Sequence, residues 1–155
     1  MKPFAEVIES SLVHWLARSW EWDLFPTFGS LVVAQDQERH LIGVVQSIQT
    51  GSLDPARYPF AYKKTPQELR AQQPQIFEFL KTTFWVALLA YEENGIIKHL
   101  LPPHPARIHT FVYPAPTELY LKIFATQDYL QLLFNQPPQT VPLDELLLAM
   151  LQEQN

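Results

Sequence analysis

The run from Thr82 to Tyr91 is apolar on both sides of an extended chain, which few folds can accommodate. Its alternating residues are Phe84, Val86, Leu88 and Ala90 on one side and Trp85, Ala87, Leu89 and Tyr91 on the other. Successive strand residues point to opposite faces, so both faces of this strand must be covered. Asn94-Gly95 follows, the pair favoured in two-residue hairpin turns that need positive φ at both positions. An antiparallel return strand is therefore predicted at Ile96 to Leu101.

Other parts of the chain also favour strands. Phe28 to Gln35 and Leu41 to Ile48 are rich in Val and Ile and flank a polar tetrad, which is a hairpin signature. Ala5 to Ser19 alternates weakly, with a break at Ser10-Ser11. A helical stripe also fits that segment, although the strand interpretation is favoured. Ile108 to Tyr113 is a short extended segment, and residues 49–59, with Gly, Ser, Asp and two prolines, are predicted as a loop.

Helix signals lie in the middle and at the end of the chain. Thr65-Pro66-Gln67-Glu68 combines an N-cap hydroxyl, Pro at the first position and Glu three residues after the cap. Pro74 interrupts this helix and leaves residues 75–80 as a second turn. Residues 117–135 are predicted as two helical pieces divided near Thr126. A Pro-Pro linker, 136–140, then precedes a tail helix with one apolar stripe: Leu143, Leu146, Leu147, Met150 and Leu151.

The pattern predicts a mainly β protein, a small β-barrel with an inserted helix at about residues 65–80 and a C-terminal helical extension. Proline does not donate to a strand ladder, so the prolines at 102–105 and 114–116 mark strand ends. Residues 1–115 are expected to form the barrel domain with its helical insertion. Residues 116–155 are expected to form the extension, which packs on the barrel or on a partner.

Charge and composition exclude several classes of function. The chain has 155 residues, with 11 Lys and Arg against 16 Asp and Glu. This balance disfavours a nucleic-acid partner, because phosphate binding depends on cationic groups. Lys63-Lys64, with Arg57 and Arg70, is the best basic patch, and a solvated surface is the favoured reading of it. No apolar run is long enough for a membrane span and the first residues do not resemble a signal peptide, so the expected location is the cytoplasm.

No residue pattern points to catalysis, a metal or a cofactor. The sequence holds no cysteine and four isolated glycines, and no phosphate-binding loop motif. His104 and His109 lie five residues apart, but the nearest carboxylates in sequence are Glu93 and Glu118, so surface histidines are favoured over a metal site. The serines lack the context of a nucleophile. The chain is therefore predicted to be a non-enzyme without cofactor.

Two groups of residues are candidates for partner binding. One is aromatic and lies in a predicted loop: Trp20, Trp22 and Phe25. Aromatic side chains are enriched at protein interfaces, but a small core beneath the loop is the more common explanation. The other group lies on the tail helix: Leu143, Leu147 and Met150. This stripe fits packing on the chain's own barrel better, with docking on a partner or on a second copy as the alternative.

Several stretches of the sequence resemble the HAS-barrel family. They are 5–11, 28–30, 43–45, 67–77 and 100–109, with the Gln- and Pro-rich stretch 67–77 the most specific. The chain is similar to stand-alone cyanobacterial members, which lack the ATPase motor domain. The resemblance covers about residues 1–115 and implies a six-stranded barrel without catalytic residues of its own.

The resemblance, together with the absence of catalytic motifs, predicts a non-enzymatic protein–protein interaction or assembly module. A protein partner or self-association is expected. The alternative is an accessory factor for a DNA-translocating or other ring ATPase encoded elsewhere, because related barrels precede such motors.

Overall fold

The computed structural model describes residues 2–54, 56, 59, 61–137 and 141–154. Six strands form a closed antiparallel barrel in the order β2-β1-β7-β3-β4-β5, and pairing of β2 with β5 closes it. β6 lies outside, beside β5. The strand bounds are β1 Ala5–Ser10, β2 His14–Ser19, β3 Leu31–Asp36, β4 Arg39–Ser52, β5 Leu80–Glu93, β6 Ile96–Lys98 and β7 Phe111–Pro114. The predicted six-stranded barrel is therefore confirmed.

Several strand boundaries differ from the prediction, most clearly those of β4 and β7. β4 continues to Ser52, because Gln49 and Thr50 pair with Thr83 and Thr82 of β5, so the predicted loop at 49–52 is wrong. β7 begins only at Phe111, where a strand from Ile108 was predicted. A turn from Arg107 to Thr110 precedes it, and His109 has φ +74°, which is incompatible with a strand.

Tight turns join the hairpins as the sequence predicts. Asn94 and Gly95 have φ of +54° and +77°, as a type I′ turn requires. β6 is shorter than predicted and ends at Lys98. Residues 5–19 form two paired strands, and the helical alternative is wrong, because alternate residues such as Val7, Trp15 and Ala17 point into the barrel.

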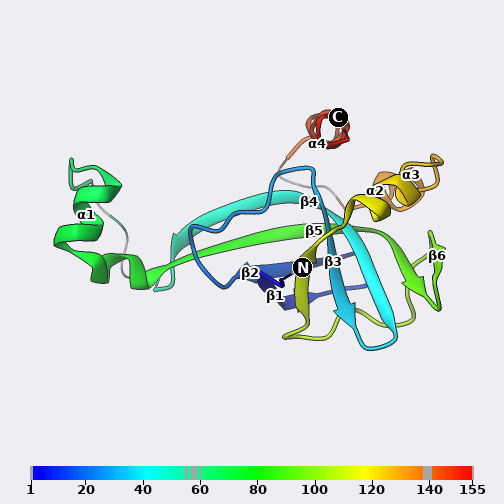
Figure 1. The fold of residues 1–155 in the computed structure, drawn as a ribbon, viewed down its shortest axis with the longest axis horizontal. Coiled ribbons are helices and arrows are strands. Elements are labelled where there is room, and N and C mark those ends of the chain that lie inside the picture. Colours follow the sequence, from blue (N-terminus) through cyan, green and yellow to red (C-terminus); the bar gives the residue numbers. More distant parts are fainter. Residues whose placement is uncertain (1, 55, 57–58, 60, 138–140, 155) are drawn as a thin grey trace.

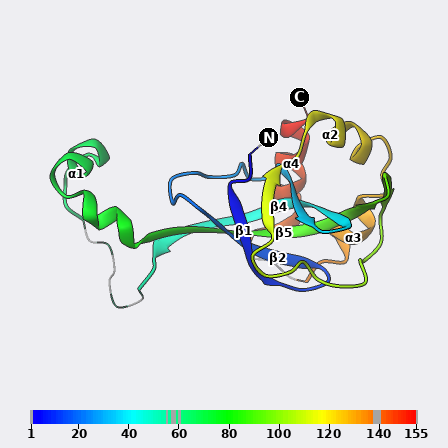
Figure 2. The same cartoon turned by 60° about the horizontal axis from the view of Figure 1, so that its bottom comes forward.

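The two faces of β5 belong to two separate apolar cores. Phe84, Val86 and Leu88 lie inside the barrel, whereas Ala87 and Leu89 point outward into a second core. Three helices cover that outer core: α2 Thr117–Ile123, α3 Leu130–Phe134 and α4 Leu143–Glu153. Figures 1 and 2 show these helices gathered over one side of the barrel. The expectation that both faces are covered is confirmed.

The Tyr120 hydroxyl and Gly29 join the helical extension to the barrel. The hydroxyl of Tyr120 on α2 accepts a hydrogen bond of 2.7 Å from the Leu31 amide, and burial raises the pKa of this phenol. Gly29 has φ +85°, and a Cβ there would lie 2.6 Å from the Cβ of Ala149 on α4. Only glycine therefore permits this close approach of helix and loop.

β4 and β5 run on past the barrel and carry two short helices at their far end (Figures 1 and 2). α1, Pro66–Gln72, starts as predicted, since the Thr65 hydroxyl accepts from the Glu68 amide. A 3₁₀ helix, η1 Pro74–Phe79, follows it and leads directly into β5. We call residues 47–82 the arm. No helix in the described ranges is long and apolar enough to cross a membrane.

Candidate interaction surface

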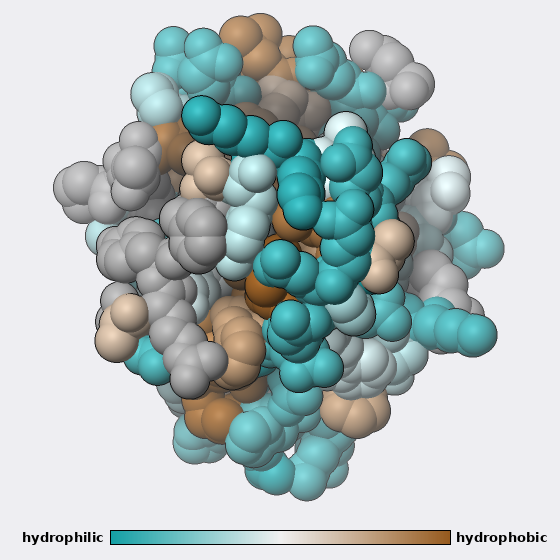
Figure 3. Space-filling view, turned by 90° about the vertical axis from the view of Figure 1, so that its left-hand side faces the viewer, coloured by the Kyte–Doolittle hydropathy of each residue, from teal (hydrophilic) through white to brown (hydrophobic). Residues whose placement is uncertain are grey.

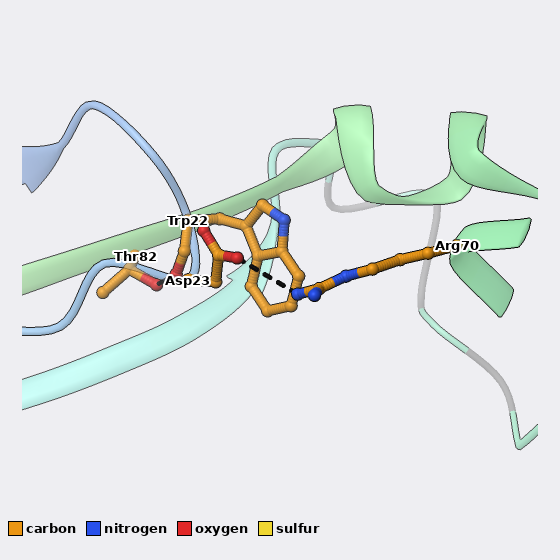
Figure 4. A network of polar contacts seen from close by, with 4 residues as sticks. All are labelled: Trp22, Asp23, Arg70 and Thr82. Carbon is orange, nitrogen blue, oxygen red and sulfur yellow. Dashed lines mark hydrogen bonds and ion pairs between the residues drawn. The ribbon is translucent and has the colours of Figure 1, made fainter. Parts of the chain in front are cut away.

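An aromatic and ionic clamp holds the arm to the loop between β2 and β3. The Trp22 ring from this loop stacks on Phe77 of η1, with centroids 5.3 Å apart and planes inclined by 5°. The Arg70 guanidinium of α1 lies 6.0 Å from the Trp22 centroid and 5.6 Å from that of Phe77. The same guanidinium bonds to Asp23 Oδ2 at 3.1 Å (Figure 4). The loop and the tip of the arm, which consists of α1 and η1, are thereby joined by one cation and two rings.

Two threonines fix the loop to the strands of the arm. The Thr82 hydroxyl donates to the Trp22 carbonyl (Figure 4). Thr82 Oγ1 also lies 2.7 Å from Thr50 Oγ1 on the neighbouring strand. Because the Thr82 proton is directed to Trp22, Thr50 must be the donor in the second bond. A chain of two hydrogen bonds therefore runs from β4 through β5 to the loop.

The clamp sets the orientation of the arm more than the stability of the fold. Exposed ion pairs contribute about 0–1 kcal/mol, and exposed cation–π contacts about 0.5–1 kcal/mol. Neither α1 nor η1 contains a buried residue. The tip therefore adds little to the core, but the clamp holds it at a defined position relative to the β2–β3 loop.

The three aromatic residues singled out in the sequence lie in three different settings. Trp22 is half-buried in the clamp. Trp20 is 48% exposed and contacts the Phe111 ring edge-on at 5.0 Å. Phe25 is 54% exposed and lines a pocket of about 340 Å³ with its neighbour Leu24. The loop thus presents Trp20 and Phe25 to solvent and uses Trp22 to hold the arm.

The three residues proposed on the tail helix are also divided. Met150 is 1% exposed in the outer core, and Leu147 packs against that core. Leu143 is partly exposed, and Leu148 and Leu151 are more exposed still, at 56% and 54%. The middle of the stripe therefore packs on the chain's own barrel, whereas the leucines at its two ends are exposed. The helices α2, α3 and α4 thus cover the outer core within one chain.

His109 pairs with a carboxylate that sequence proximity does not reveal. Its Nδ1 lies 2.7 Å from Oε2 of Glu6, and the Trp20 indole N–H donates to Oε1 of the same carboxylate at 3.0 Å. The His109 hydrogen bond is the main reason that the pKa of Glu6 lies below its ordinary value. Glu93, one of the nearest carboxylates in sequence, instead contacts Arg39 and Lys98. Among the described residues, no group of three or more potential metal ligands occurs.

The basic patch is partly used within the chain. Arg70 belongs to the clamp, and Lys64 Nζ donates to the Gln72 side chain at 2.6 Å. Sequence reasoning missed the clamp partners Asp23, Phe77 and Thr82. Arg70 was marked by its charge and Trp22 by its aromatic setting, but nothing local in the sequence connects them.

The comparisons with known proteins leave the fold and the surface as the basis for any functional argument. No family model matches the chain, and no curated protein matches it. The HAS-barrel resemblance and the role it implies therefore stay predictions.

Proposed function

We propose that this chain is a non-enzymatic protein-interaction or assembly module, in which the barrel supports the arm and the arm makes the contact. The observation that carries this proposal is the combination of order and exposure at the arm tip. α1 and η1 bury no side chain, although contacts to Trp22 and Asp23 of the β2–β3 loop hold the arm in place. A segment that does not fill the core and is nevertheless positioned by specific contacts is suited to recognition.

The surface of the tip supports a protein partner. Seen end-on from the arm side, hydrophobic patches show between hydrophilic side chains (Figure 3). Leu53 and Phe79, where the strands meet the tip, are 37% and 38% exposed. Residues 53–81 contain five basic and three acidic residues, whereas the rest of the chain contains six basic and thirteen acidic ones. The arm therefore differs in charge from the barrel and offers mixed apolar and cationic contacts.

The test removes the tip and leaves the barrel intact. The Leu53 amide donates to the Phe79 carbonyl, so this hydrogen-bonded pair can flank a two-residue hairpin turn, and residues 54–78 can be replaced by Asn-Gly. The truncated chain should melt cooperatively at a temperature similar to that of the full chain, because the tip holds no buried side chain in α1 or η1. Glu38→Gln, in the turn at the other end of β4, is the matched control.

Cross-linking in native lysate of the source organism and sedimentation of the pure protein provide the readout. The full chain and Glu38→Gln should recover one partner in near-stoichiometric amount or self-associate, and the truncated chain should do neither. If the full chain stays monomeric and recovers no partner, or if the truncated chain retains the same partner, the proposal is wrong.

A further inference from the structure

β4 leaves one edge without a partner strand along the arm. In the barrel, β3 pairs with β4 as far as Val44, and Gly29 and Ser30 then bond to Val45. Beyond that point, Ser47–Ser52 pair with β5 on one side only. Within the described part of the chain, no backbone group bonds to their other side. Such an edge presents N–H and C=O groups that an added strand can satisfy.

The register shows which residues direct these groups outward. The Leu53 amide donates to the Phe79 carbonyl, which places Leu53 in a hydrogen-bonded pair with β5. Hydrogen-bonded and non-hydrogen-bonded pairs alternate along an antiparallel ladder. Counting back from Leu53, the backbone groups of Ile48, Thr50 and Ser52 face away from β5. Three such residues at alternate positions can pair with an added strand of about five residues.

A groove of about 890 Å³ borders this edge. Its lining includes six consecutive residues of β4, Ser47–Ser52, together with Leu16, Trp85 and Lys81 among others. Side chains alternate between the two faces of a strand, so six consecutive residues line one groove only where the backbone itself is accessible. The unpaired edge therefore lies beside a space large enough for another chain.

The edge also lacks the features that usually block strand addition. Natural edge strands are protected by charged side chains, prolines, bulges or short length. β6, an edge strand of three residues, carries Lys98 and fits this rule. Ser47–Ser52 contains no charge and no proline, and the nearby bulge falls before Ser47. This edge is open to pairing in a way that β6 is not.

Two residues indicate the chemistry of an added strand. Among the described residues, no atom outside Gly51 and its two chain neighbours lies within 4 Å of the position of a Cβ on Gly51, which leaves room for a bulky neighbouring side chain. Lys81, opposite Gly51 on β5, lines the groove and makes no ion pair within the described residues. A second copy of β4 would bring Ser, Gln and Gly to this place and no acid for Lys81.

We propose that the outer edge of β4 at Ile48, Thr50 and Ser52 binds an extended segment of a partner protein as an added β-strand. The bound segment carries a bulky side chain beside Gly51 and an Asp or Glu directed to Lys81. This inference rests on the proposed function and specifies how part of the contact is made. Backbone pairing supplies the affinity, and the Gly51 and Lys81 positions supply the selectivity.

Two substitutions at one residue isolate the backbone contribution. Thr50→Pro removes an outward N–H, and proline is tolerated in an edge strand where its missing N–H faces solvent. Thr50→Val loses the same side-chain hydroxyl but keeps the N–H, so it is the matched control. The probe is a phage-displayed library of random decapeptides selected on the full chain, followed by the best binder as a labelled synthetic peptide.

The selected peptides should contain alternating β-branched or aromatic residues and an acid. Binding should weaken about tenfold or more in Thr50→Pro, as for the loss of one hydrogen bond, and less than about twofold in Thr50→Val. In the unsubstituted chain, the peptide should slow amide hydrogen exchange at Ile48, Thr50 and Ser52, and this second measurement holds even if Thr50→Pro folds poorly. Peptides selected on the Lys81→Glu variant should carry a basic residue in place of the acidic one.

Three outcomes would overturn the inference: no peptide is selected, the exchange of these three amides is unchanged by the bound peptide, or the edge is covered by a second copy in solution. The tip-deleted chain keeps Ser47–Ser52 and should still bind the peptide. Loss of the cellular partner on tip deletion, without any edge-binding peptide, would therefore retain the proposed function and reject the edge site.

Discussion

The ladder between β4 and β5 has one half in the barrel and one half in the arm, and only the barrel half is buried on both faces. Val44 and Val45 on β4 and Val86 on β5 are 0% exposed. Gln49 and Thr50, farther along β4, are exposed. The ladder is continuous, so pairing alone does not distinguish the two halves. Burial specifies the barrel half, and polar contacts to one loop specify the arm half. The same hairpin thus supplies both the core and the displayed surface.

The largest expected difference between the halves is at two glycines of β4. A Cβ on Gly43 would lie 2.4 Å from Val86 Cγ1 and 2.6 Å from the Ala87 carbonyl oxygen, whereas a Cβ on Gly51 would meet no atom of the described, non-adjacent residues within 4 Å. Gly43→Ala should therefore lower the free energy of unfolding by roughly 1–3 kcal/mol. Gly51→Ala should change it by less than about 0.5 kcal/mol or raise it slightly, because Ala is less costly than Gly in a strand.

Urea unfolding followed by tryptophan fluorescence measures both variants. Equal losses at Gly43 and Gly51 would show that the arm is as tightly packed as the barrel, and the division between core and display would then be wrong. Both variants replace Gly by Ala on the same strand, so strand propensity does not account for the expected difference between their free energies of unfolding.

Local patterns in the sequence predict the barrel half well and the arm half poorly. The two-faced run of β5 and the Asn94-Gly95 turn are each encoded within a few residues, and in the arm the Thr65 cap of α1 is encoded in the same way. By contrast, the Gln-Thr-Gly-Ser composition at 49–52 is typical of a loop, and these residues become strand only because β5 pairs with them. Whether residues 49–52 form a strand or a loop therefore depends on residues about thirty positions away, which no local pattern contains.

The candidate surface was less predictable than the fold for the same reason. Asp23 and Arg70 are 47 positions apart, and Glu6 and His109 are 103 apart. Charge and aromatic composition drew attention to Arg70 and Trp22 separately. Only the fold brings them together, since the barrel places the β2–β3 loop beside the arm.

A smaller effect on stability is expected when the pH is lowered, and it should arise in the barrel and not in the arm. The His109 hydrogen bond holds the pKa of Glu6 below the ordinary 4.5, so the folded state favours the ionised carboxylate. That contribution is complete above the unfolded pKa and is lost as the pH falls through the lower, folded value. Glu6→Gln should therefore lower the melting temperature at about pH 6, and the difference from the unsubstituted chain should shrink as the pH falls below the ordinary pKa of 4.5.

Asp23→Asn on the arm clamp is the control for this titration. Its effect on global unfolding should stay below about 1 kcal/mol throughout, because an exposed ion pair contributes little. A Glu6→Gln difference that is constant from neutral pH to acid would mean that ionisation of Glu6 does not contribute. A large effect of Asp23→Asn on the melting temperature would mean that the clamp belongs to the cooperative core.

The smallest global effect, and the clearest local one, is expected at Arg70. Its guanidinium lies over two rings and bonds to Asp23, and Lys can retain the charge without the planar contact. Arg70→Lys should leave global unfolding within about 0.5 kcal/mol. Amide exchange in α1 and η1 should become about two- to fivefold faster, which corresponds to the loss of an exposed cation–π contact of about 0.5–1 kcal/mol.

Comparison of Arg70→Lys with Arg70→Ala separates the charge from the stacking contact. Arg70→Ala removes both and should accelerate amide exchange at the tip further, while the amides of β1 and β2 in the barrel keep their exchange rates. If Arg70→Lys exchanges at the unsubstituted rate and only Arg70→Ala is faster, the ion pair to Asp23 alone orients the tip. If neither variant changes the amide exchange rates at the tip, the Trp22–Phe77 stack and the Thr82 hydrogen bond position the arm without Arg70. Faster exchange throughout the barrel would instead show that arm and barrel open together, since local opening is confined to cooperative units.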